Sequence, residues 1–207
     1  MEVKERIQQK AEELFRKLGI RSVTMDEIAN QLGISKKTIY IFYADKDDIV
    51  DAVISNMISY NQECCNHDRS VAQNAIHEVF LAMEMIQEMF QNMNPTILFD
   101  LERGHPKAYQ KFIQHKYKYL YQVMKENVDR GISEELYRPE LQPDVIAKLR
   151  LETMMLSFNQ QLFPQAKYNL IDVEQQLIEH YLYGMASLKG HKMILKYQNA
   201  RQKSISR

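Results

Sequence analysis

The sequence predicts an all-α protein, and three observations carry that prediction. Apolar residues recur at the 3.6-residue spacing of an amphipathic helix along most of the 207-residue chain. Strand-like alternation of apolar and polar residues is rare, and the chain holds only six glycines and five prolines. Hydrophobic residues make up 45% of the composition, which is enough for a real core.

The N-terminal region begins with two helical patterns. The first covers roughly residues 3–18, where apolar residues recur every three or four positions and Gly19 follows as a C-terminal cap. The second, short helix opens after Thr24, an N-cap residue with Glu27 three positions later, which is the spacing of a capping box. Gly33 ends this helix at a turn where a positive φ is expected.

A third short helix is predicted at roughly 36–42, with Ser35 as its N-cap. This helix is expected to direct Ile39 and either Phe42 or Tyr43 toward the core. Helices this short are marginal in water on their own, so both must pack on their longer neighbours. Such a pair, joined by a glycine-containing turn, is typical of a helix-turn-helix within a small tri-helical core. A fourth helix starts near Lys46.

The rest of the chain is predicted to form longer helices. A polar segment, residues 64–69, suggests a domain boundary. Helices are then expected at roughly 70–92, 95–101, 106–130 (ended by Gly131), 143–163 and 172–188, with a loop at 132–142 and a basic tail from Lys189 onward.

Charge and composition limit the functions that this protein can have. The chain has 27 basic and 27 acidic residues, so contact with DNA phosphates would require local segregation of charge. The stretch from Ala29 to Ala44 provides it, with two lysines and no acid. No apolar run approaches the ~18 residues that span a bilayer, and the N-terminus lacks a signal-like apolar segment, so we expect a cytoplasmic protein without a membrane partner.

The predicted third helix carries side chains suited to DNA. Lys36 and Lys37 lie in its first turn, where recognition helices usually reach base edges. Thr38 and Tyr40 offer hydroxyl groups to phosphate or a contact to the methyl group of thymine. Thr24 and Ser35 stand at helix N-termini, which favour anions such as phosphate.

The N-terminal segment resembles the TetR family of regulators. The resemblance rests on a set of positions between Ile7 and Val50, namely Ile7, Ala11, Leu14, Phe15, Gly19, Thr24, Ile28-Ala29, Gly33-Ile34-Ser35, Thr38-Ile39-Tyr40 and Lys46. It implies a repressor-like homodimer that binds palindromic double-stranded DNA and is released by a small molecule. We predict a DNA-binding domain at residues 1–48 and a ligand-binding and dimerisation domain at 49–207.

The predicted DNA-contacting set combines this resemblance with the residue chemistry. It comprises Thr24, Ser35, Lys36, Lys37, Thr38, Tyr40, Tyr43 and Lys46. One departure from the family pattern concerns the two positions before the lysine-containing turn, where the family usually has Tyr or His followed by Phe. This chain has Phe42 and Tyr43, and Phe42 cannot donate a hydrogen bond to phosphate.

The C-terminal region is expected to supply the dimer interface and the effector site. The family resemblance implies a four-helix interface between subunits, for which we predict Leu149, Thr153, Leu156, Tyr181, Gly184 and Leu188. Burial within one subunit is the alternative for these residues. Methionine suits adaptable apolar pockets, so we expect a mainly apolar effector contacted by Phe80, Met83, Phe99, Tyr119 and Met155, with ordinary core packing as the alternative.

Other functions have weaker support. The sequence lacks the nucleotide-binding, nucleophile-elbow and zinc-protease motifs, so we expect no enzyme, cofactor or metal. The adjacent Cys64 and Cys65, with His67 nearby, leave a thiol- or metal-responsive regulator as an alternative. A helical interaction module that does not read DNA is the alternative of a different class.

Overall fold

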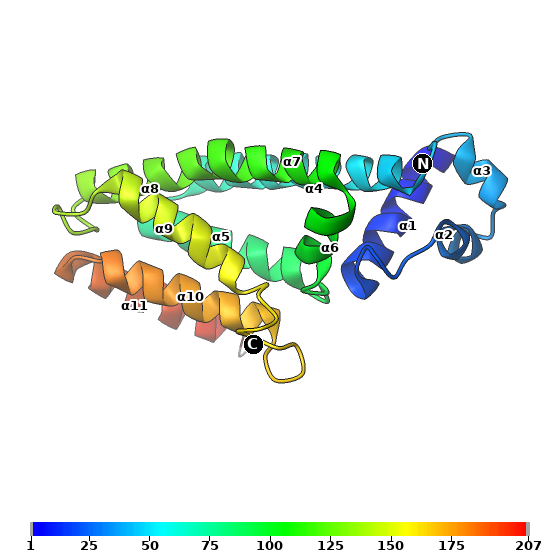
Figure 1. The fold of residues 1–207 in the computed structure, drawn as a ribbon. Helices are drawn as coiled ribbons and strands as arrows, with labels where there is room; N and C mark the ends of the chain where they lie inside the picture. The colour runs from blue at the N-terminus through cyan, green and yellow to red at the C-terminus, as the bar shows by residue number, and fades with distance from the viewer. Residues whose placement is uncertain (1, 206–207) are drawn as a thin grey trace. The chain divides into compact units, whose positions relative to one another are not determined.

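The computed structural model describes residues 2–205, with side chains up to Arg201, and its elements are helices (Figure 1). The chain forms two compact units. The first contains residues up to 62 together with 92–115, and the second contains 63–91 together with 116–207. These units divide the chain differently from the predicted functional domains, whose boundary at 48/49 stays a prediction. No helix within the described part of the chain is long and apolar enough to cross a membrane.

The first unit holds the predicted tri-helical core. Its helices are α1 (Val3–Leu18), α2 (Met25–Leu32), α3 (Lys36–Tyr40), the first part of α4 (Lys46–Val71), α6 (Ile97–Gly104) and α7 (Pro106–Gln114). The inward stripe of each short helix is buried, and the core side chains of the first four helices include Ile7, Ala11, Leu14, Phe15, Met25, Ile28, Ala29, Ile39, Ile49, Val50 and Val53. The bounds of α1 agree with the predicted helix 3–18.

The predicted caps set where α2 and α3 begin. The hydroxyl of Thr24 accepts a hydrogen bond from the backbone N–H of Glu27 at 3.1 Å, and that of Ser35 accepts one from the N–H of Thr38 at 3.1 Å. Each bond satisfies a donor that the first helical turn leaves unpaired. Gly33 has a φ of 65°, so the turn between the two helices uses the left-handed conformation that glycine adopts without strain.

The helix α6 packs against the turn between α1 and α2, a contact that the sequence did not predict. The side chain of Asp100 accepts a hydrogen bond from the backbone N–H of Arg21 at 2.9 Å, and the N–H of Asn94 donates to the carbonyl of Arg16 at 2.5 Å. Gly19 lies beneath α6 with a φ of 81°, and a Cβ there would come within 2.8 Å of the Thr96 hydroxyl. The first unit is therefore larger than the N-terminal segment alone.

The second unit is a bundle around α5 (Ala75–Phe90). It continues with most of η1 (His115–Leu120), a π-helical segment that joins α7 to α8 (Tyr121–Ser133), and with α9 (Pro143–Leu156), α10 (Leu170–Met185) and α11 (Leu188–Ile205). The helix α5 packs against α8, α10 and α11, while α9 packs against α8 and α10. The core includes Ala75, Ile76, Phe80, Met83, Val128, Leu136, Tyr137, Ile178, Leu182, Met185 and Ile194.

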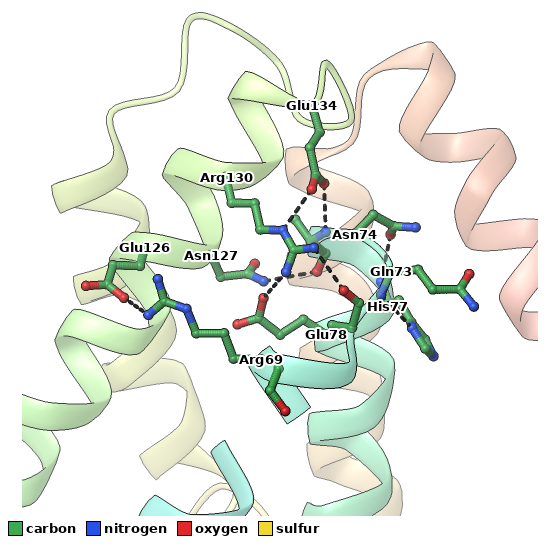
Figure 2. Close-up of polar contacts among 12 residues, drawn as sticks. Arg69, Gln73, Asn74, His77, Glu78, Glu126, Asn127, Arg130 and Glu134 are labelled. Carbon is green, nitrogen blue, oxygen red and sulfur yellow. Dashed lines mark hydrogen bonds and ion pairs between the residues drawn. The ribbon is translucent and has the colours of Figure 1, made fainter. Parts of the chain in front are cut away.

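Polar contacts explain why α4 ends at Val71 and α5 begins at Ala75, where the sequence predicted a polar boundary at 64–69 and one helix over 70–92. The Asn74 side chain caps α5 by accepting from the N–H of His77 at 2.9 Å. Arg130 of α8 donates to the carbonyl of Ala72 at 3.0 Å, which holds the end of α4 (Figure 2). The polar segment 64–69 is therefore helical and belongs to α4.

The same arginine lies in a network of charges. Its guanidinium donates to Glu78 at 3.1 Å and to Glu134 at 2.8 Å, as Figure 2 shows. Glu134 also accepts from the backbone N–H of Ala75 at 2.8 Å, and Asn127 donates to the carbonyl of Ala75 at 3.0 Å. The α4–α5 junction is thus fixed to α8 by hydrogen bonds to charged groups, which are stronger than neutral ones.

Two further predicted helix ends were wrong. Gly131 lies inside α8 and does not end it. A glycine is needed at this position because the ring of Tyr137 occupies the space of a side chain, and a Cβ would lie 2.0 Å from its Cδ2. The helix α9 ends at Leu156, because the side chain of Asn159 accepts from the backbone N–H groups of Gln161 and Leu162 and stabilises a turn instead.

The basic tail is also helical, forming α11 after a break at Ala186 and Ser187. Ile194 is fully buried in the core of the second unit. The ring of Tyr197 packs against that of Phe80, with 5.4 Å between their centroids. The tail therefore buries apolar side chains that its overall basic composition did not reveal.

Candidate nucleic-acid interface

The helix α3 presents basic and aromatic side chains on its outer surface. Ile39 is completely buried and anchors the helix, while Lys36, Lys37 and Tyr40 are exposed. Thr38 is half-buried, and its hydroxyl lies 2.9 Å from that of Ser35. This arrangement leaves one side of a short, firmly packed helix available to a partner.

Lys36 and Lys37 differ in their surroundings. The Lys36 ammonium forms an ion pair with Asp26 of α2 at 2.9 Å, and this hydrogen bond raises the pKa of Lys36. The pair is exposed, so it is screened by salt and contributes little to folding stability. Contact between Lys36 and a phosphate would require exchange of Asp26 for the phosphate. Lys37 is exposed on the same helix.

Two residues of the predicted set are engaged within the domain. The ring of Tyr43 is buried, with 4% of its surface exposed, and burial raises the pKa of its hydroxyl. The half-buried Lys46 donates to the carbonyl of Ile20 at 2.6 Å, and burial lowers its pKa. Both side chains hold α3 and α4 against the core, so any role in DNA contact stays a prediction.

The choice between Phe42 and Tyr43 is decided by packing. Tyr43 lies four residues after Ile39 and joins it in the core, because positions i and i+4 share one side of a helical turn. Phe42 is 38% exposed, and Ile41 is 71% exposed. Ile41 was not among the residues predicted from the sequence. The uninterrupted apolar run from Ile39 to Tyr43 was a usable signal, because one helical turn cannot bury all five side chains.

The predicted effector contacts fall in different environments. Phe80 and Met83 are buried in the core of the second unit, whereas Tyr119 and Met155 are half-buried in that unit. Phe99 belongs to the first unit and is exposed, with the Arg103 guanidinium 5.3 Å from its ring. The burial of Phe80 and Met83 is what ordinary core packing requires, so the effector site stays a prediction.

The predicted dimer residues lie on α9, α10 and the start of α11. Leu149 and Leu156 are exposed, and Leu188 is 89% exposed. Gly184 is exposed, and a Cβ there would meet no atom within 4 Å. The other two predicted residues, Thr153 and Tyr181, are half-buried. Thr153 donates to the carbonyl of Arg150, and the Tyr181 ring lies beside the Arg150 guanidinium.

Cys64 and Cys65 lie on α4 and are not joined in a disulfide. Both are half-buried, and burial raises the pKa of Cys65 to about 12. The thiolate, which is the reactive form, is therefore scarce at neutral pH at this position. Within residues 2–205, no cluster of three or more His, Cys, Asp or Glu side chains is placed to hold a metal ion.

A short capped helix with a buried anchor and lysines on its free side is typical of the recognition helix in DNA-binding regulators of the helix-turn-helix class. The family described as "Bacterial regulatory proteins, tetR family" matches residues 7–53. The N-terminal segment of the chain is therefore similar to the TetR family. This similarity and the names of relatives indicate a regulator rather than an enzyme.

One sequence relative is the HTH-type transcriptional regulator YvaF of Bacillus subtilis (strain 168). It is 28% identical over 95 residues, which cover 42% of this chain and 47% of the relative. The chain therefore matches about half the length of that protein.

Solved structures extend the similarity over both units. A transcriptional regulator from Saccharomonospora viridis in complex with choline has a TM-score of 0.73 at 16% identity, covering 89% of this chain and 97% of its own. The regulator FadR from Bacillus subtilis, in complex with stearoyl-CoA, has a TM-score of 0.66 at 17% identity, covering 87% and 98%. At these identities the similarity shows the fold.

Proposed function

We propose that this protein is a repressor of the TetR family that binds a palindromic operator as a homodimer and leaves it when a small molecule binds. The observation that carries the DNA-binding part is α3, whose buried Ile39 fixes a helix with exposed Lys36, Lys37 and Tyr40. In this arrangement the lysines contact guanine edges or phosphates, and the Tyr40 and Thr38 hydroxyls contact phosphates.

The other predicted contacts support α3. Thr24 and Ser35 stand at the N-termini of α2 and α3, with their hydroxyls committed to the caps. Tyr43 and Lys46 act chiefly as positioning residues, because the core already holds both side chains. DNA contact by these four residues is proposed as secondary to that by α3.

Fluorescence anisotropy across a salt series tests sequence-specific DNA binding. It compares DNA from upstream of the protein's own gene with scrambled DNA. We expect tight binding that prefers the upstream DNA and weakens as salt rises. Lys37→Ala should weaken binding and reduce the salt slope by about 0.9 for each phosphate that is no longer neutralised. Lys192→Ala, at an exposed position on α11, is the matched control and should leave both unchanged. A wild-type slope for Lys37→Ala would contradict the role of Lys37.

The proposed dimer uses the exposed apolar side chains of α9, α10 and α11. Leu149, Leu156 and Leu188 are large, apolar and exposed in one chain, so a second subunit that covered them would remove apolar surface from water. The open space above Gly184 allows a partner helix to approach the backbone closely. A symmetric dimer would place two copies of α3 in successive major grooves, about 34–36 Å apart.

Light scattering on the purified protein tests this interface. The wild type should be a dimer at micromolar concentration, and Leu149→Glu should shift it toward monomer, because the substitution buries a charge in the interface. Val71→Glu changes an equally apolar, exposed residue at the end of α4 and should remain dimeric. A monomeric wild type would exclude the proposal.

The proposed effector is a small, mainly apolar molecule that binds in the second unit and contacts Phe80, Met83, Tyr119 and Met155. Support comes from relatives of the same fold that were solved with choline and with stearoyl-CoA. Their ligands differ in size and charge, so they support ligand response rather than one ligand. Release of fluorescent operator DNA by fatty acyl, aromatic and cationic compounds would identify the class, and release by cationic compounds alone would refute an apolar effector.

The thiol-responsive alternative centres on Cys64 and Cys65. The raised pKa of Cys65 disfavours it, because the thiolate is the species that reacts with oxidants and binds metals. A regulator of this kind would release operator DNA on mild oxidation or on addition of zinc, and the Cys64→Ser, Cys65→Ser double variant would not.

A further inference from the structure

The surface next to the exposed lysines of α3 is apolar. Tyr40, Ile41 and Phe42 are three consecutive exposed residues, and Ile41 shows 71% of its surface. Scattered exposed apolar residues are common, but three in sequence on one short turn form a patch. We name these three residues the apolar ridge.

The apolar ridge is continuous with the DNA-binding side of α3. Ile41 is helical in conformation, with φ −68° and ψ −31°, so it extends the helix by one position. Lys37 and Ile41 are four residues apart, and residues at this spacing lie on the same side of a helix. The opposite side holds Ile39 and Tyr43, which are both buried. Lys37 and Ile41 therefore lie on the same side of α3, away from its buried side.

The chemistry of this side chain selects its partner on DNA. Isoleucine and phenylalanine have no hydrogen-bonding groups, so they cannot bind phosphate or the polar edges of bases. The major groove offers one apolar group at base edges, the C5-methyl of thymine. Cytosine carries hydrogen at the same ring position, so contact with the methyl group distinguishes thymine from cytosine.

We propose that Ile41, flanked by Phe42, reads thymine C5-methyl groups in the major groove, which makes the operator thymine-specific at this position of each half-site. The proposal rests on the proposed function, since it requires sequence-specific DNA binding by α3. It adds a source of specificity that does not depend on the lysines.

The test replaces thymine by deoxyuridine, which removes the methyl group and leaves the hydrogen-bonding edge unchanged. The operator is first obtained by repeated selection from a random duplex pool, and each thymine that the selection enriches is then replaced singly in labelled duplexes. At one position of each half-site, we expect about a fourfold loss of affinity per methyl group, which corresponds to the ~0.8 kcal/mol of one buried carbon.

Variants assign the effect to Ile41. In Ile41→Ala the loss on deoxyuridine should fall below about twofold, because the side chain that meets the methyl group is already absent. Leu18→Ala changes an exposed leucine at the end of α1 and should keep the full loss. The high exposure of Ile41 makes its replacement harmless to folding, which circular dichroism would verify.

Several results would overturn the inference. A selected operator without an enriched thymine, or equal affinity for the thymine and deoxyuridine duplexes, excludes methyl recognition while DNA binding stands. If Ile41→Ala loses affinity for the thymine and deoxyuridine duplexes by the same factor, Ile41 contacts the sugar-phosphate backbone instead. Failure to enrich any sequence refutes sequence-specific binding itself, and the inference with it.

Discussion

Mild acid should destabilise the protein through His115. This imidazole is 7% exposed; its Nε2 lies 2.9 Å from the Asn61 Oδ1, and its Nδ1 lies 3.4 Å from the Gln62 Nε2. Burial lowers the pKa of His115 from 6.5 to about 4, because the charged ring would lose its hydration. The neutral ring donates to Asn61 and accepts from Gln62, an arrangement that protonation would break.

The size and sign of the effect follow from the two pKa values. Above pH 6.5 the ring is neutral in the folded and unfolded chains and contributes no pH dependence. Between pH 6.5 and 4 only the unfolded chain binds the proton, so the free energy of unfolding falls as the pH falls. A pKa difference of about 2.5, at 1.36 kcal/mol per pKa unit, gives a total loss of about 3.4 kcal/mol. About 2 kcal/mol of this is lost by pH 5.

Urea unfolding at pH 7.5, 6.5, 5.5 and 5.0, at one protein concentration, measures the effect. We expect the free-energy difference between wild type and His115→Gln to change by about 2 kcal/mol over this range, since glutamine does not titrate. His180→Gln, at an exposed position on α10, should give a curve parallel to the wild type. Parallel curves for His115→Gln as well would refute the reasoning, because they would mean that His115 titrates alike in both states.

Three further predictions concern the stability of the fold. Gly131→Ala should destabilise the protein by about 1–3 kcal/mol in urea unfolding, because the added methyl group overlaps the ring of Tyr137, and an unchanged midpoint would contradict this packing. Arg150→Ala should cost about 3–5 kcal/mol, because it leaves the buried Glu174 carboxylate without its ion-pair partner. The double variant Arg150→Met, Glu174→Leu should regain most of the stability that Arg150→Ala loses, because it removes both charges. A double variant as unstable as Arg150→Ala would show that the ion pair itself is stabilising. Thr24→Ala should destabilise the protein by about 1 kcal/mol through loss of the α2 cap. The melting temperature should fall by about 2–4 °C, and an unshifted melting curve would show that water replaces the cap.

The sequence by itself determined the local features of the DNA-binding region. The period of the apolar residues placed α1, and the caps at Thr24 and Ser35 placed the starts of α2 and α3. These features depend on residues within one helical turn of each other, so they can be read from the chain directly. The combination of motifs also indicated the family before the fold was known.

Only the tertiary structure decided which side chains remain available for function. Whether Phe42 or Tyr43 faces the core, and whether Lys46 reaches solvent or the Ile20 carbonyl, depends on where neighbouring helices pack. The same holds for Gly131, which resembles a helix end in sequence but accommodates the ring of Tyr137. Contacts between residues distant in the chain are set by packing geometry, which periodicity along one helix does not encode.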